Sequence, residues 1–180
     1  MSDRKTFQQL ADIAQGLKII LLDVDGVMTD GGIILIGGLE EAKRFNVQDG
    51  MGINLAKLAG LKVGVITSRQ LLVVERRATE LDLDEVLQGV KDKTKALGRL
   101  LDKYGFEADQ VSYIGDDIQD VSIMKMVGMP ISVKNAIQEV KEHAFYVTRA
   151  EGGNGAVREA VEWLLDLRGE KKSLLSGFGI

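Results

Sequence analysis

The sequence contains no cysteine among its 180 residues. A disulfide framework, a thiolate nucleophile and a sulfur-ligated zinc site are therefore excluded, and any bound metal should have oxygen ligands. Proline occurs once, at Pro130, so the chain has no rigid proline-rich linker. The one histidine, His143, lies on a predicted helix away from the acidic motifs described below, which favours a structural role over a catalytic one.

The sequence also lacks an excess of positive charge and a long apolar run. The net charge of −4 and the isoelectric point near 5.1 argue against a nucleic-acid partner. The first thirty residues lack a signal-peptide pattern, and the apolar run at 19–22 is too short to cross a bilayer, so we expect a cytoplasmic protein without a membrane partner. With 45% hydrophobic and 28% charged residues, the composition fits a single globular domain over residues 1–180.

Hydrophobic patterns along the chain alternate between those of strands and those of helices. Strands are predicted at residues 19–22, 62–67, 86–88, 111–115, 130–133 and 145–148, and helices at 5–16, 51–59, 71–81, 93–104, 120–127, 136–143 and 156–167. Strands that are separated by helices favour right-handed crossovers between parallel strands. The expected fold is therefore α/β, with a doubly wound parallel sheet.

Two further segments depart from this alternation. Residues 32–36 and 41–46 predict a β-hairpin that turns at Gly37 and Gly38 and projects from the end of the first strand. Residues 169–180 show no clear period, and we expect a mobile tail there.

Chemistry-bearing side chains follow the predicted strands. Asp23 and Asp25 end the first strand two residues apart, so their side chains point to the same side; taken alone, with Gly26, they could equally form a turn. Three later strand ends also carry polar residues, namely Thr67, then Lys93, and then Asp116, Asp117 and Asp120. Because parallel strands place their carboxyl ends at one edge of a sheet, this order predicts a single acidic site suited to a cation.

The order and types of these residues resemble the haloacid dehalogenase superfamily, whose phosphatases share DxDG, a strand-end Thr or Ser, a lysine, and GDD or GDxxxD. Further segments resemble the 3-deoxy-D-manno-octulosonate 8-phosphate phosphatases, at residues 29–31, 43–47, 49–53, 69, 75–78, 133–136 and 152–159. The resemblance extends from about Lys18 to Leu167. It implies a haloacid dehalogenase-like, Rossmann-like fold without a large cap domain, a Mg²⁺-dependent phosphomonoesterase, and a place in lipopolysaccharide biosynthesis.

The resemblance also implies roles for individual residues. Asp23 would be the nucleophile that forms an aspartyl-phosphate, and Asp25 the general acid and base. Thr67 would donate a hydrogen bond to the phosphoryl group, and Lys93, which matches the family's lysine better than Lys91, would neutralise its charge. The Mg²⁺ ligands would be Asp23, the main-chain carbonyl of Asp25, and Asp116, supported by Asp117 and Asp120.

The acid sugar phosphate would be held by the segment Asn46, Val47, Gln48, Asp49 and Gly50, together with Lys93, Arg69 and Arg77. A guanidinium suits a 2-keto carboxylate because it can donate two parallel hydrogen bonds. The sequence leaves open whether Arg76 or Arg77 points inward. Leu35, Asn54 and Ser68 depart from common family residues, so a related nonulosonate 9-phosphate is an alternative substrate.

Members of this family without a cap form homotetramers, and the apolar residues of the hairpin favour the same assembly here. Leu174, Leu175 and Phe178 in the tail could then line a neighbouring site, or the tail could be a disordered end. A non-enzymatic alternative is a phospho-accepting receiver domain, which also combines acidic residues, a hydroxyl and a lysine. In such a domain the acceptor aspartate would precede the hydroxyl and the lysine, whereas Thr67 and Lys93 precede Asp116 here.

Overall fold

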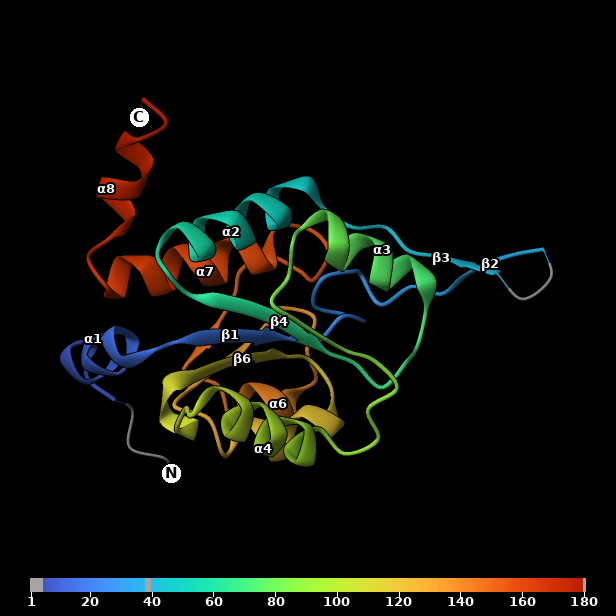
Figure 1. Cartoon of the computed structure of the whole chain (residues 1–180), viewed down its shortest axis with the longest axis horizontal. Coiled ribbons are helices and arrows are strands. Elements are labelled where there is room, and N and C mark those ends of the chain that lie inside the picture. Colours follow the sequence, from blue (N-terminus) through green and yellow to red (C-terminus); the bar gives the residue numbers. More distant parts are fainter. Residues whose placement is uncertain (1–4, 38–39, 180) are drawn as a thin grey trace.

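Six parallel strands form the centre of the protein in a computed structural model, which describes residues 5–37 and 40–179. The sheet has the order β5-β4-β1-β6-β7-β8 (Figure 1). The strands are β1 (Ile19–Leu22), β4 (Lys62–Ile66), β5 (Glu85–Leu87), β6 (Val111–Gly115), β7 (Met129–Ser132) and β8 (Tyr146–Val147). This arrangement confirms the predicted doubly wound α/β fold.

Strand β1 lies in the middle of the sheet and is buried along its whole length. Its last residue, Leu22, pairs with Val65 of β4 and Ile114 of β6. All four residues of β1 are apolar because helices cover both faces of the sheet. The register places the residues that follow β1, β4 and β6 at one edge of the sheet.

Helices cover the sheet in two layers (Figure 1). One layer contains α2 (Val47–Leu58), α3 (Leu72–Glu80) and α7 (Ala156–Leu167), and the other contains α4 (Lys93–Tyr104) and α6 (Gln138–Lys141). The remaining elements are α1 (Phe7–Gly16), α5 (Val121–Met124), α8 (Lys171–Ser176) and two 3₁₀ turns, η1 (Ala108–Gln110) and η2 (Ile118–Asp120). In the described part of the chain, none of these helices has the length and apolar character of a membrane span.

Helix α2 begins four residues earlier than predicted. Asn46 caps it, since its side-chain Oδ1 accepts a hydrogen bond from the Gln48 N–H at 2.7 Å. Gly50 and Gly52 lie inside the helix, although glycine disfavours helices. A Cβ on Gly52 would lie 2.7 Å from the Arg158 Cα, so this glycine allows α2 and α7 to approach closely. Tertiary packing therefore overrides the local preference.

Helices α5 and α6 are shorter than predicted, with four residues each. Before α5, the Asp117 side chain accepts a hydrogen bond from the Ile118 N–H and forms a capping box with Asp120. This arrangement winds Ile118–Asp120 into the tighter turn η2, so the α-helix begins only at Val121.

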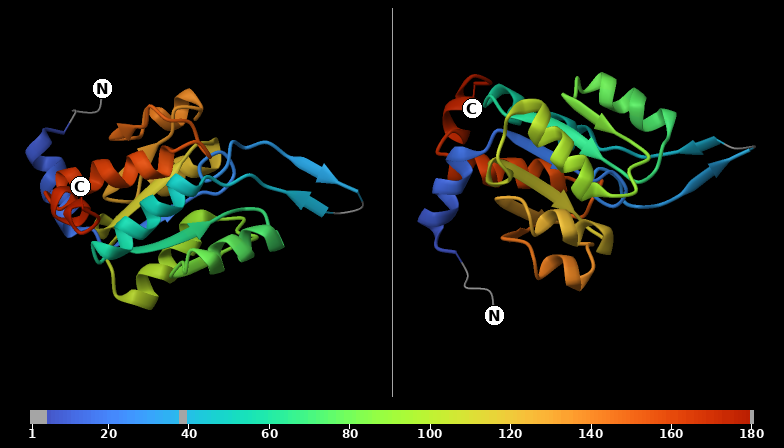
Figure 2. Two further views of the ribbon diagram at one scale, coloured as in Figure 1. Left: turned by 90° about the horizontal axis from the view of Figure 1, so that it is seen from above. Right: turned by 60° about the horizontal axis from the view of Figure 1, so that its bottom comes forward.

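The predicted hairpin is present and projects from the sheet (Figure 2). Its strands, β2 (Ile34–Ile36) and β3 (Glu40–Ala42), are antiparallel, with Ile34 opposite Ala42 and Leu35 opposite Glu41. The predicted turn residue Gly38 lies outside the described residues. Both strands are shorter than predicted: the first begins at Ile34, and the second ends at Ala42, after which residues 43–46 form neither strand nor helix.

The tail forms a helix, α8, where no period is visible in the sequence. Leu174 and Leu175 pack against the chain's own core. In Figure 1, α8 lies at the end of the molecule opposite the hairpin. The mobility of the tail stays a prediction.

Candidate active site

A buried carboxylate and a buried ammonium meet at the end of β1. Asp23 follows β1 directly, and its backbone N–H donates to the Ile114 carbonyl of β6 at 2.9 Å. Lys93, the first residue of α4, donates from Nζ to Asp23 Oδ1. Both residues are almost fully buried. Lys91, the alternative lysine of the sequence, is exposed.

Asp120 and Tyr113 hold Lys93 in this position. Lys93 Nζ lies 2.6 Å from Asp120 Oδ1 and 2.9 Å from the Tyr113 hydroxyl, which itself donates to Asp120 Oδ1 at 2.7 Å. The second oxygen of Asp120 accepts from the N–H groups of Asp116 and Asp117 at 2.9 and 3.2 Å. Both oxygens of Asp120 are thus engaged within the protein.

The cluster of charges shifts the pKa values of its members. Burial raises the pKa of Asp23 to about 7, against the lowering effect of Lys93, and the charge of Asp120 adds to the rise. Burial and the nearby carboxylates of Asp23 and Asp120 raise the pKa of Asp116 to about 8. Burial by itself would lower the pKa of Lys93, but Asp23 and Asp120 raise it, so Lys93 remains cationic.

The geometry fits a small divalent cation. Carboxylate oxygens of Asp23, Asp116 and Asp120 lie within 4.8 Å of one another. Oxygen ligands are what Mg²⁺ prefers, so this group of carboxylates could hold such an ion. Gly26, at φ +91°, leaves space for this: a Cβ there would lie 1.9 Å from Asp116 Oδ2.

An asparagine clasp holds the loop that contains Asp25 and Gly26. Asn135 Nδ2 donates to the Gly26 carbonyl at 2.9 Å, and Asn135 Oδ1 accepts from the Gly152 N–H at 2.6 Å. Gly152 approaches so closely that a Cβ on it would lie 1.8 Å from the Gly26 oxygen. The clasp therefore ties three loops together next to the carboxylates.

Thr67 and Arg69 lie at the same edge of the sheet. Thr67 follows β4 and is buried, and its Oγ1 accepts a hydrogen bond from the Arg69 N–H at 3.3 Å. The Arg69 guanidinium is 35% exposed and donates from Nη2 to Glu41 Oε2. Arg69 thus lies at the mouth of the site, already paired with a carboxylate of the hairpin.

Glu41 and Lys43 belong to the site, although neither was among the site residues predicted from the sequence. The Lys43 side chain is fully buried and donates from Nζ to Asp25 Oδ1. It also lies 3.1 Å from Glu41 Oε1. Their spacing of two residues on a predicted strand is a signal for a shared face, but the sequence does not show which residues that face contacts.

Arg77, and not Arg76, turns toward the segment Asn46–Gly50. Its guanidinium lies 5.8 Å from the centre of the Phe45 ring and 3.4 Å from the Asn46 carbonyl. A Cβ on Gly50 would lie 2.7 Å from Arg77 Nη2, so the glycine makes room for this arginine. Arg76 is exposed.

The members of the segment Asn46–Gly50 differ in their surroundings. Val47 and Gln48 are exposed, whereas Asp49 is buried. Asp49 accepts hydrogen bonds from the N–H groups of Arg158 at 2.9 Å and Gly155 at 3.2 Å. Its carboxylate therefore holds the beginning of α7 and is not free for a ligand in this structure.

Known proteins share both the sequence and the fold of this chain. The pattern of the haloacid dehalogenase-like hydrolases matches residues 83–159. The 3-deoxy-D-manno-octulosonate 8-phosphate phosphatase of Escherichia coli K12 is 40% identical over 157 residues, which cover 87% of this chain and 84% of the relative. The chain belongs to the 3-deoxy-D-manno-octulosonate 8-phosphate phosphatase family. The receiver-domain alternative is thereby excluded.

Solved structures of the octulosonate phosphatase family superimpose over nearly the whole chain. The enzyme of Moraxella catarrhalis, solved with Mg²⁺, phosphate and KDO, is 36% identical, with a TM-score of 0.92 over 96% of this chain and 99% of that one. The cobalt-bound enzyme of Haemophilus influenzae is 31% identical, with a TM-score of 0.88 over 93% and 99% of the two chains. These two related structures thus contain a metal ion, Mg²⁺ in the first and cobalt in the second.

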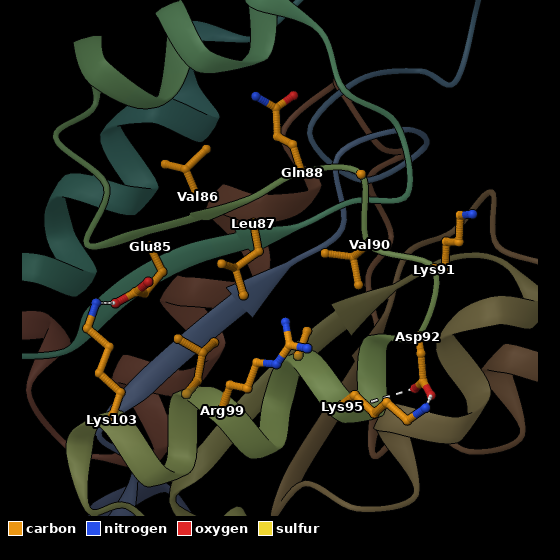
Figure 3. Close-up of a pocket in the computed structure, with 13 residues that line it drawn as sticks. Glu85, Val86, Leu87, Gln88, Val90, Lys91, Asp92, Lys95, Arg99 and Lys103 are labelled. Carbon is orange, nitrogen blue, oxygen red and sulfur yellow. Dashed lines mark hydrogen bonds and ion pairs between the residues drawn. The ribbon is translucent and has the colours of Figure 1, made fainter.

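A separate cavity of about 640 Å³ lies between β5 and α4 (Figure 3). Its lining includes Leu87, Val90 and Arg99, and Lys103 is paired with Glu85 at its edge. None of the residues that we assign to the family's site lines this cavity. The acidic cluster is therefore distinct from it.

Proposed function

We propose that the protein is a Mg²⁺-dependent phosphatase that hydrolyses 3-deoxy-D-manno-octulosonate 8-phosphate to the free acid sugar and phosphate. The observation that carries this proposal is the environment of Asp23, a buried carboxylate held by Lys93 and adjacent to Asp116 in a chain of this family. Mg²⁺, phosphate and KDO accompany the related enzyme of M. catarrhalis, and the oxygen-rich donor set here suits the same cation.

The reaction proceeds in two displacements at phosphorus. Asp23 attacks the phosphorus, the bond between phosphorus and the sugar oxygen breaks, and Asp25 gives its proton to the leaving oxygen. Asp25 then takes a proton from water, and this water attacks the aspartyl-phosphate, which releases phosphate and restores Asp23. Lys43 holds the Asp25 carboxylate at the edge of the site.

Charge must be offset for a carboxylate to attack a phosphate dianion. Asp23, the main-chain carbonyl of Asp25 and Asp116 would hold Mg²⁺, which would supply positive charge beside the transferring group. Lys93 adds a second, permanently buried positive charge, and the Thr67 hydroxyl is available to donate to a phosphoryl oxygen. Asp117 and Asp120 support this set through the loop after β6.

The acid sugar is recognised by cationic groups around the mouth of the site. Arg69, at the end of β4, offers its guanidinium to the carboxylate of the sugar, and Arg77 acts on the segment Asn46–Gly50. Asn46, Val47, Gln48 and Gly50 would contact the substrate, whereas Asp49 contributes through the beginning of α7.

Phosphate release from an aryl phosphate, with and without Mg²⁺, tests the reaction class. Asp23→Asn should abolish turnover because an amide cannot form the acyl-phosphate, and Asp25→Asn should lower kcat severely. His143→Gln, remote from the site, is the control for handling and folding. Activity of Asp23→Asn at the wild-type level would refute the mechanism. A comparison of octulosonate 8-phosphate with nonulosonate 9-phosphates tests the substrate.

A homotetramer would complete this site. The strand β2 exposes Ile34, Leu35 and Ile36, with Leu35 80% exposed, and an isolated apolar hairpin in water invites a partner. Phe178 is the tail residue best able to reach a neighbouring subunit, because Leu174 and Leu175 pack on their own chain. Light scattering should report four chains, and a fully active monomer would refute the assembly. The cytoplasmic location and the place in lipopolysaccharide biosynthesis stay predictions.

A further inference from the structure

The guanidinium that we assign to the substrate's carboxylate is already paired in this structure. Arg69 Nη2 donates to Glu41 Oε2, and the Glu41 side chain is only 5% exposed. Arg69 itself is 35% exposed, so an anion from solvent can approach its free edge. Glu41 thus contacts the same guanidinium that we assign to the carboxylate of the substrate.

Glu41 also has a second cationic partner. Its Oε1 lies 3.1 Å from Lys43 Nζ, and within the described residues this buried oxygen makes no well-directed hydrogen bond. The ammonium of Lys43 and the guanidinium of Arg69 outweigh the effect of burial, which would raise the pKa of Glu41, and so lower that pKa. Glu41 is therefore an anion with one partner toward the solvent and one partner inside.

Because Glu41 has two cationic partners, a carboxylate of a ligand can replace it on Arg69 at a small cost in free energy. If Arg69 turned to another anion, Glu41 would keep the positive charge of Lys43, so no buried charge would be left without a partner. A free carboxylate can accept two parallel hydrogen bonds from a guanidinium, whereas Glu41 accepts from Nη2 alone. A ligand that has a phosphate ester but no carboxylate cannot make this exchange.

We propose that Glu41 is a specificity-determining residue, an internal carboxylate that occupies Arg69 until the carboxylate of an acid sugar phosphate displaces it. The inference rests on the proposed function and deepens it. Glu41 lowers the affinity for acid sugar phosphates by competing for Arg69, and it leaves the affinity for phosphate esters without a carboxylate unchanged. It acts through Arg69 and takes no part in the transfer of the phosphoryl group.

The test compares Glu41→Gln with the wild type on two substrates, 3-deoxy-D-manno-octulosonate 8-phosphate and p-nitrophenyl phosphate. Glutamine keeps the size of the side chain but is a weak competitor, so KM for the acid sugar phosphate should fall by about three- to tenfold. KM for p-nitrophenyl phosphate should stay the same. Glu75→Gln, which makes the same change on the exposed face of α3, should alter neither value.

Glu41→Asp provides a second variant that preserves the charge beside Lys43. Its shorter side chain withdraws from Arg69, so KM for the acid sugar phosphate should fall here too. A fall in KM in both variants would indicate lost competition for Arg69, because misfolding would not lower KM. A rise in KM for the acid sugar in both variants, or an equal change on both substrates, would overturn the proposal. A wild type that hydrolyses p-nitrophenyl phosphate but not the octulosonate ester would instead overturn the proposed function, and this inference with it.

Discussion

The acidic cluster makes the stability of the fold depend on pH and on Mg²⁺ together. The pKa values of Asp23, about 7, and Asp116, about 8, lie above the value of 3.8 for a free aspartate. At pH values between 3.8 and the raised pKa values, the folded protein holds protons that the unfolded chain has already released. Without Mg²⁺, the free energy of unfolding should therefore fall as the pH rises from 6 to 8.

Asp116 makes the larger contribution to this effect, because its higher pKa keeps it protonated over most of the range from pH 6 to 8. One extra bound proton changes the free energy of unfolding by about 1.4 kcal/mol per pH unit. Asp116 is partly exposed, so solvent screening reduces the total over two pH units to about 2 kcal/mol. For a domain of this size, that corresponds to a fall in Tm of about 4–8 °C.

Thermal melting in EDTA and in millimolar Mg²⁺, at pH 6 and pH 8, measures the effect. Mg²⁺ replaces the protons, so the rise in Tm that it causes should be larger at pH 8 than at pH 6. Asp116→Asn should remove the larger part of the pH dependence, and the proton on Asp23 should account for the remainder. Asp117→Asn, in which the amide oxygen can still cap η2, should keep it. A Tm in EDTA that is unchanged between the two pH values would refute this reasoning.

Two further substitutions test the contacts around the cluster. Tyr113→Phe removes the hydroxyl between Lys93 and Asp120, so kcat should fall about tenfold with KM unchanged and stability should fall by about 1–2 kcal/mol; an unchanged kcat would show that Asp23 and Asp120 suffice to place the ammonium. Asn135→Ala removes the clasp on Gly26, so stability should fall by about 1–3 kcal/mol and half-maximal activity should need more Mg²⁺, whereas the exposed Asn154→Ala should leave the Mg²⁺ requirement unchanged.

The strands and the edge that carries the site were predictable because local patterns determine them. A continuous apolar run such as Ile19–Leu22 indicates a strand covered on both faces, and the residue that follows it must lie at the end of the sheet. Asp23, Thr67 and Asp116 were placed by this rule. Helix boundaries were less predictable where glycines occur, as in α2. Gly52 is needed there because the backbone of Arg158, far away in the sequence, packs against it.

Side-chain pairings between distant segments were not predictable. The sequence shows Glu41 and Lys43 on one strand, but their partners, Arg69 and Asp25, lie 28 and 18 residues away. Likewise, helical periodicity does not choose between Arg76 and Arg77. The choice depends on the Phe45 ring and on the space that Gly50 leaves.

The hairpin has a consequence for the protein during its synthesis. Strand β3 and the residue just after it carry Glu41 and Lys43 into the site, while β2 offers its apolar surface to other chains. In the assembly that we propose, contacts between chains would also fix the strand that positions Asp25. A newly made chain that has not yet met its partners would therefore be a poor phosphatase. Other phosphate esters in the cell would be spared until assembly completes the enzyme.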